Sequence, residues 1–134
     1  MNEVLFRKIE RLKEEVLYLQ ANKKNILENI ELSTETKKIA ERSVYLCAEI
    51  ALDIAETVIA IKWIPRPSTY SDSIYKLGEH KIMPKVFTRK FAYIAWLRNF
   101  LAHTYQVETT TDLQKFLRIG IAAAKRFIGF MERI

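Results

Sequence analysis

The spacing of apolar residues predicts helices along nearly the whole chain. Apolar residues recur at alternating four- and three-residue intervals over residues 5–30, which is the pattern of an amphipathic helix with a coiled-coil-like seam. Ser33 or Thr34 is a suitable N-cap for a second helix, which we expect over residues 35–63. This helix should end before the Pro65–Pro67 segment, because proline lacks a backbone donor and disfavours helical geometry in the residue before it.

The middle of the chain carries weaker helix signals. Ser71 or Asp72 is expected to cap a short helix that runs to Leu77 and is closed by Gly78. Pro84 fits the first turn of the next helix, because a missing N–H is harmless at that position. Apolar residues at helical spacing extend the helix that starts at Pro84 as far as Leu101.

The last helix should start within Thr109–Asp112 and carry a long apolar face to the C-terminus. The pattern therefore predicts an all-α protein, an antiparallel bundle of four long helices and one short helix joined by short connections. We expect a single domain over residues 1–134. It would consist of an N-terminal amphipathic helix (1–32) and a bundle (33–134) that carries the candidate chemistry.

The second helix is apolar on nearly every side between Val44 and Ile61. A helix of this kind has to be buried on more than one face. In so small a bundle, a second copy of the chain is the simplest cover for the additional face. We therefore expect a two-fold homodimer.

Composition and charge narrow the class of partner. The chain has 134 residues, of which 49% are hydrophobic and 28% charged, as in a globular domain of ordinary size. Its net charge of +6 favours a polyanionic partner such as RNA, or an acidic protein. A basic surface that binds nothing explains the charge equally well.

The single cysteine and the lack of a long uncharged segment indicate the cellular compartment in which we expect the protein. Cys47 excludes an internal disulfide and a cysteine-based zinc site, and suggests a reducing compartment such as the cytoplasm. The N-terminus is charged and periodic from the outset, which argues against a secretory signal. Four charged residues interrupt the most apolar stretch, Val44–Ile64, so we expect no membrane span.

The candidate chemistry lies in the nine-residue stretch 97–105. Arg98 supplies a permanent cation that can hold a phosphate with two hydrogen bonds, and His103 can carry a proton in either direction. On an ideal helix at about 100° per residue, Asn99 shares a face with His103, whereas Arg98 and His103 lie roughly 140° apart. Arg98 and His103 would flank one phosphate if the helix opens near its end or if a second copy completes the site. Alternatively, these side chains only satisfy carbonyls at a helix C-terminus.

A second group of polar residues forms a stripe on the second helix. Arg42, Glu49, Asp53 and Glu56 are spaced seven, four and three residues apart. The stripe is either a solvated face with internal ion pairs, or it brings Glu49 or Asp53 to the cleft to orient Arg98 or His103. No histidine stands at ligand spacing from these carboxylates, so we expect no metal site and no cofactor.

The string Arg98, four residues, His103, one residue, Tyr105 resembles the signature of the HEPN proteins, in particular their HepT-like toxin branch. Residues 42–55 are similar to the second helix of that branch, and the similarity covers residue 34 to the C-terminus. The resemblance implies a helical bundle that dimerises with the motif in a composite cleft. It also implies a metal-independent endoribonuclease in which Arg98 holds the scissile phosphate and His103 is the general acid or base. Asn99 would support them.

The same resemblance implies a partner and a modification. HepT-like toxins are paired with a minimal nucleotidyltransferase antitoxin in type VII-like toxin–antitoxin systems, and this antitoxin transfers AMP to the tyrosine of the motif, here Tyr105. A phosphate group added beside Arg98 would fill the anion site and repel RNA. The alternative is a non-catalytic helical module that binds a nucleotide or the nucleotidyltransferase. A purely structural adaptor would leave the cluster from Arg98 to Tyr105 unexplained.

Overall fold

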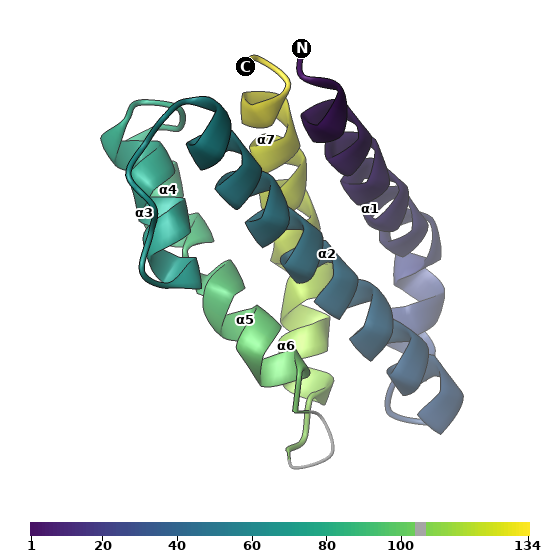
Figure 1. Cartoon of the computed structure of the whole chain (residues 1–134). Coiled ribbons are helices and arrows are strands. Elements are labelled where there is room, and N and C mark those ends of the chain that lie inside the picture. The colour runs from purple at the N-terminus through teal and green to yellow at the C-terminus, as the bar shows by residue number, and fades with distance from the viewer. Residues whose placement is uncertain (104–106) are drawn as a thin grey trace.

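The structure, a computed structural model, describes residues 1–103 and 107–134, and these residues contain helices and turns but no strand. In chain order the elements are α1 (Glu3–Asn29), α2 (Thr34–Ile61), α3 (Tyr70–Glu79), α4 (Lys85–Phe91), α5 (Tyr93–Leu101), α6 (Thr110–Lys115), a π-helical turn (Phe116–Gly120) and α7 (Ile121–Met131). The predicted all-α bundle is confirmed (Figure 1). None of the described helices is both long and apolar enough to cross a membrane.

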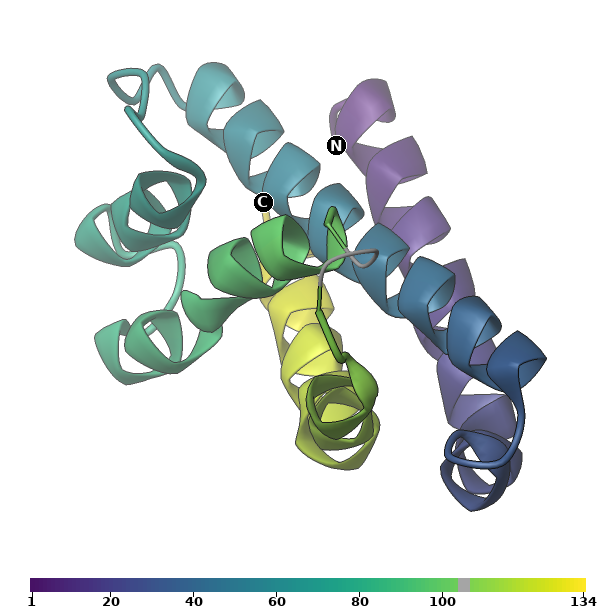
Figure 2. The same ribbon diagram turned by 90° about the horizontal axis from the view of Figure 1, so that it is seen from below.

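The two longest helices, α1 and α2, lie side by side and run antiparallel, with α7 packed along α1 (Figure 1). Helices α3 and α5 cover the opposite side of α2, α4 packs on α3, and both chain ends lie at one end of the bundle (Figures 1 and 2). A single cluster of buried apolar side chains joins these layers. Its largest fully buried members are Phe91, Phe116 and Phe127.

Much of the apolar surface of α2 is covered within the single chain. Eleven residues of α2 are buried, among them Val44, Leu52 and Val58. Helices α1, α3, α5 and α6 of the same chain contact α2, whereas Ile50 and Ile61 stay partly exposed. The dimer that we expected from the apolar pattern of α2 therefore stays a prediction.

The helix starts are partly as expected. Ser33 caps α2 by accepting a hydrogen bond from the N–H of Thr36, as predicted. The expected cap of α3 was wrong, because Thr69 accepts from the N–H of Asp72 and is the cap. Gly78 does not close α3 either, since the helix continues through Glu79.

The single helix expected between Pro84 and Leu101 is two helices, α4 and α5, with a break at Ala92. No proline or glycine stands at the break. The two halves pack against different partners: Phe91 on α4 stacks on Phe127 of α7, whereas α5 packs on α2. Pro84 precedes α4 as its N-cap and is not in its first turn.

The last helix begins at Thr110, as expected, but contains a π-helical turn over Phe116–Gly120. The N–H of Ile121 bonds the carbonyl of Phe116, one residue further back than in an α-helix. The ring of Phe116 occupies the place that a Cβ on Gly120 would take. Glycine at this position therefore allows the wider turn to keep the aromatic ring in the core.

Two glycines with opposite surroundings provide a test of the packing. A Cβ on Gly78 would lie 2.5–2.9 Å from the side chain of Thr88, which is 3% exposed, whereas a Cβ on Gly129 would meet nothing within 4 Å. We expect Gly78→Ala to lower the free energy of unfolding by ~1–3 kcal/mol through overpacking. Gly129→Ala should raise it by ~0.5–1 kcal/mol through helix propensity. Urea denaturation measures both changes, and equal effects would contradict the close contact of α3 with α4.

Candidate functional site

Arg98 lies in the last turn of α5 and is held by a carboxylate from α2. Its Nε donates a 2.7 Å hydrogen bond to Glu49 Oε2, and its Nη1 donates to the carboxamide oxygen of Asn99 at 3.2 Å. The Arg98 side chain is 24% exposed and that of Glu49 is 36% exposed. Arginine has five N–H donors, so the guanidinium keeps donors for an anion that approaches from solvent. These bonds argue against the alternative in which Arg98 only satisfies helix carbonyls.

Two tyrosines that the sequence did not single out complete the surroundings of Arg98. Its guanidinium carbon lies 5.0 Å from the ring centre of Tyr70 and 5.8 Å from that of Tyr45. Tyr45 also donates a 2.8 Å hydrogen bond to Glu49 Oε2. The pair Tyr45–Glu49 has the i,i+4 spacing of a helix and was detectable. Tyr70 was not, because it reaches Arg98 across the contact of α3 with α5.

The three charged or phenolic groups shift one another's proton affinity. Partial burial alone would raise the pKa of Glu49, but the hydrogen bonds from Arg98 and Tyr45 outweigh it and lower that pKa. The hydrogen bond to Glu49 raises the pKa of Arg98 and also that of the Tyr45 phenol. At neutral pH the site therefore contains a carboxylate, a guanidinium cation and a neutral phenol.

His103 lies in the turn that follows α5, because the helix ends at Leu101. Its backbone N–H bonds the carbonyl of Phe100, three residues earlier, so the helical spacing that aligned Asn99 with His103 does not apply. Asn99 instead bonds Arg98. We required the helix to open for Arg98 and His103 to serve one site, and it ends before His103. His103 is an exposed residue.

The acidic stripe of α2 divides among three neighbours. Glu49 meets Arg98, whereas Asp53 accepts a 3.0 Å hydrogen bond from Lys8 on α1. Of the two carboxylates expected to orient the motif, Asp53 is therefore not the one brought to Arg98. Glu56 lines a groove together with Asn99, the residue that follows Arg98.

Tyr105, the expected site of modification, lies outside the described residues. The chain after it is held to α2: Lys37 Nζ bonds Glu108 at 2.8 Å, and the Thr109 hydroxyl donates to Glu41. The bonds from Lys37 and Thr110 lower the pKa of Glu108 to about 2.

Metal binding and nucleophilic catalysis by cysteine receive no support from the described residues. They contain no group of three or more histidine, cysteine, aspartate or glutamate side chains arranged to hold a metal ion. Cys47 is buried, and burial raises the pKa of its thiol to about 12, so it is a poor nucleophile. Cys47 is instead a small buried side chain of the core.

The pairing of Glu49 predicts a pH dependence of stability. Because the pKa of Glu49 is lower in the folded protein than its ordinary value of 4.5, its contribution is present at neutral pH and disappears as pH falls through the lowered pKa. We expect Glu49→Gln to be less stable than wild type by ~1 kcal/mol at pH 7, and the difference to narrow below pH 4. Thermal unfolding between pH 7 and 3 measures it, with the exposed Glu28→Gln on α1 as control. A difference that stays constant with pH would contradict the ionised pair.

Comparison with known proteins places this fold. The Ribonuclease HepT-like family matches residues 6–129. The structure is similar to a tri-AMPylated Shewanella oneidensis HEPN toxin in complex with MNT antitoxin (17% identity, TM-score 0.89) and to a toxin–antitoxin with AMP-PNP (16%, 0.88), each over 100% of both chains. It is also similar to a mutant toxin–antitoxin MntA-HpeT (16%, 0.87, over 99% of this chain and 100% of that one). No functionally curated protein matches. Since the family match spans most of its length, the chain belongs to the Ribonuclease HepT-like family.

Proposed function

We propose that this protein is a metal-independent endoribonuclease, and the toxin of a toxin–antitoxin pair, with Arg98 and His103 as its catalytic residues. The observation that supports this most directly is the hydrogen bond that Arg98 Nε donates to Glu49. It holds a partly exposed cation in one orientation at the end of α5, five residues before the exposed His103. A fixed cation beside a proton carrier is what phosphodiester cleavage requires.

Arg98 would hold the scissile phosphate and stabilise the charge that develops on its oxygens. Because Glu49 and Asn99 occupy Nε and one position on Nη1, the remaining donors are aimed by bonds already made before RNA binds. Such preorganisation lowers the barrier because no donor has to reorient during the reaction. The net charge of +6 would draw RNA to the site.

His103 would serve the two proton transfers of cleavage. The ribose 2′-oxygen loses its proton to an imidazole and attacks phosphorus, and the bond from phosphorus to the 5′-oxygen breaks as that oxygen gains a proton. The products are a 2′,3′-cyclic phosphate and a 5′-hydroxyl. No metal ion or cofactor is needed for these steps. In a dimer cleft, the copies of His103 from the two chains would supply the base and the acid.

The homodimer belongs to this proposal although α2 does not demand it. Helix α5 presents Trp96, which is 52% exposed and stacks on Phe100 with ring centres 4.8 Å apart. A partly exposed aromatic pair of this kind is typical of interfaces. Both residues are within three positions of Asn99, so a two-fold contact through this face would bring the C-terminal ends of two α5 helices, which carry the motif, together.

We further propose a minimal nucleotidyltransferase as antitoxin and Tyr105 as the residue it modifies with AMP. The support is the motif spacing and the fold, which is shared with a tri-AMPylated toxin bound to an MNT antitoxin. A phosphate attached to Tyr105 would compete with RNA for Arg98 and add negative charge at the site.

Cleavage of RNA in EDTA tests the nuclease proposal. We expect wild-type protein to cleave RNA with EDTA present, and His103→Ala to lose ~10²–10⁴-fold in rate. His80→Ala is the matched control, since His80 is the other histidine of the chain, is exposed, and follows α3. The proposal is wrong if His103→Ala cleaves as fast as wild type. If no RNA is cleaved by either protein, the non-catalytic nucleotide- or antitoxin-binding module becomes the better interpretation.

Mass spectrometry tests the modification. After co-expression with a minimal nucleotidyltransferase, wild-type protein should carry added AMP, and Tyr105→Phe should carry none. Tyr75→Phe, at an exposed tyrosine on α3, should be modified like wild type. AMP found on Tyr105→Phe at the wild-type level would remove Tyr105 from the proposal.

A further inference from the structure

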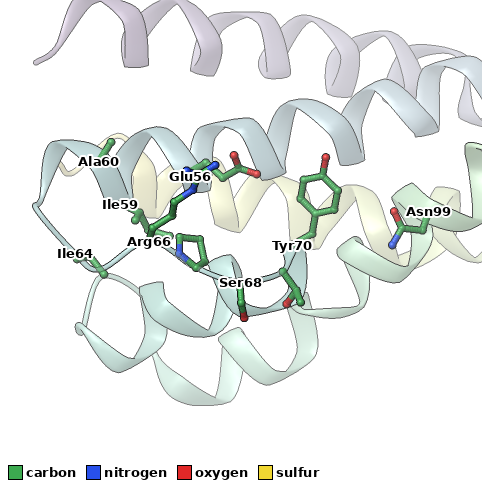
Figure 3. Close-up of a pocket in the computed structure, with 10 residues that line it drawn as sticks. Glu56, Ile59, Ala60, Ile64, Arg66, Ser68, Tyr70 and Asn99 are labelled. Atoms are coloured by element: carbon green, nitrogen blue, oxygen red, sulfur yellow. The ribbon is translucent and has the colours of Figure 1, made fainter.

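A groove of about 660 Å³ lies next to Tyr70 and Asn99, two of the neighbours of Arg98. It runs between the second half of α2, the connection that precedes α3 and the end of α5 (Figure 3). Six polar side chains line it: Glu56, Arg66, Ser68, Thr69, Tyr70 and Asn99. Its apolar lining includes Ile59, which is 3% exposed. The volume is within the range of small-molecule sites, about 300–1,000 Å³.

The groove and the proposed phosphate site share two residues. Asn99 accepts a hydrogen bond from Arg98, and the ring of Tyr70 lies 5.0 Å from the Arg98 guanidinium carbon. Both side chains also line the groove. A phosphate held by Arg98 would therefore carry one of its nucleotides to the mouth of this groove.

The far end of the groove pairs an acceptor with a donor. Glu56 and Arg66 lie together at that end, with Tyr70 between them and Asn99 (Figure 3). Within the described residues, neither side chain makes a hydrogen bond or ion pair with another side chain, in contrast to Glu49 and Asp53 on the same helix. Glu56 is seven residues from Glu49, so the two carboxylates share a face of α2 about 10 Å apart along the axis.

The chemistry of these two groups selects among the bases. A carboxylate only accepts hydrogen bonds and a guanidinium only donates them. Guanine offers two adjacent donors, N1–H and N2–H, to the carboxylate and two acceptors, O6 and N7, to the guanidinium. Arginine is the usual partner of that acceptor pair. Uracil has one donor on this edge and lacks N7, and cytosine lacks both N7 and a ring N–H donor. RNA bases are read in this way where the strand is unpaired.

We propose that this groove binds the base of the nucleotide attached to the phosphate at Arg98, and that Glu56 and Arg66 select guanine there. The proposal rests on the proposed ribonuclease function for the identity of its ligand, single-stranded RNA. It adds a base preference next to the cleaved bond, set by residues outside the Arg98–His103 motif.

Nucleotide binding tests this without requiring cleavage. The four nucleoside 3′-monophosphates carry the same phosphate, so differences in their dissociation constants, measured by isothermal titration calorimetry, report the base. We expect wild type to bind the guanosine nucleotide ~10–100-fold more tightly than the uridine nucleotide. Glu56→Gln should reduce this ratio to within a few-fold of one and leave the affinity for the uridine nucleotide nearly unchanged.

Matched variants separate base reading from charge and folding. Glu28→Gln makes the same change on an exposed position of α1 and should keep the guanosine preference. Arg66→Gln should lower the preference as Glu56→Gln does, so the proposal does not depend on one variant. Circular dichroism verifies that each variant is folded.

The outcomes distinguish this proposal from the nuclease proposal. Guanosine preference that depends on Glu56 supports the groove even if no RNA is cleaved, in which case only the nuclease proposal fails. Equal affinities of wild type for all four nucleotides, or a preference unaffected by both variants, would overturn the guanine groove. The cleavage assay would then still test the nuclease proposal independently.

Discussion

The burial of α2 along most of its length is the constraint on which the rest of the structure depends. Helix α1 packs on one side of it and α3 and α5 on the other, so the position of every candidate residue is set relative to this helix. Small side chains along the buried faces, such as Ala48, Ala51 and Ala55, let the neighbouring helices approach closely. The polar face that remains on α2 is narrow, and its carboxylates are directed to different neighbours.

The bond between Glu49 and Arg98 serves orientation more than stability. A partly exposed ion pair contributes little to folding free energy, because solvent screens it and both groups lose hydration. Its main effect is on geometry. The Arg98 side chain is flexible and could adopt many rotamers. One hydrogen bond to α2, one to Asn99 and two aromatic rings restrict it to one orientation. The same contacts connect the cation to the groove, because Tyr70 and Asn99 belong to both.

Several features of the fold were predictable because they depend on local chemistry. The amphipathic pattern of α1, the Ser33 cap and the start of the last helix involve residues within a few positions of one another. The break at Ala92 was not predictable, since it results from α4 packing on α7 while α5 packs on α2. The apolar pattern of α2 likewise shows that its faces are buried, but it does not identify whether helices of the same chain or a second copy bury them.

At the candidate site, the sequence by itself determined which residue types are present: Arg98, His103 and a carboxylate stripe on the second helix. It left open whether Glu49 or Asp53 would reach Arg98. The tertiary structure decided for Glu49, because α5 crosses α2 at that level while Lys8 of α1 takes Asp53. Only the packing of α3 against α5 brought Tyr70 to Arg98, since the two lie 28 positions apart in the chain. Helical spacing fixes which residues share a face, whereas the contact across two helices depends on how the whole core packs.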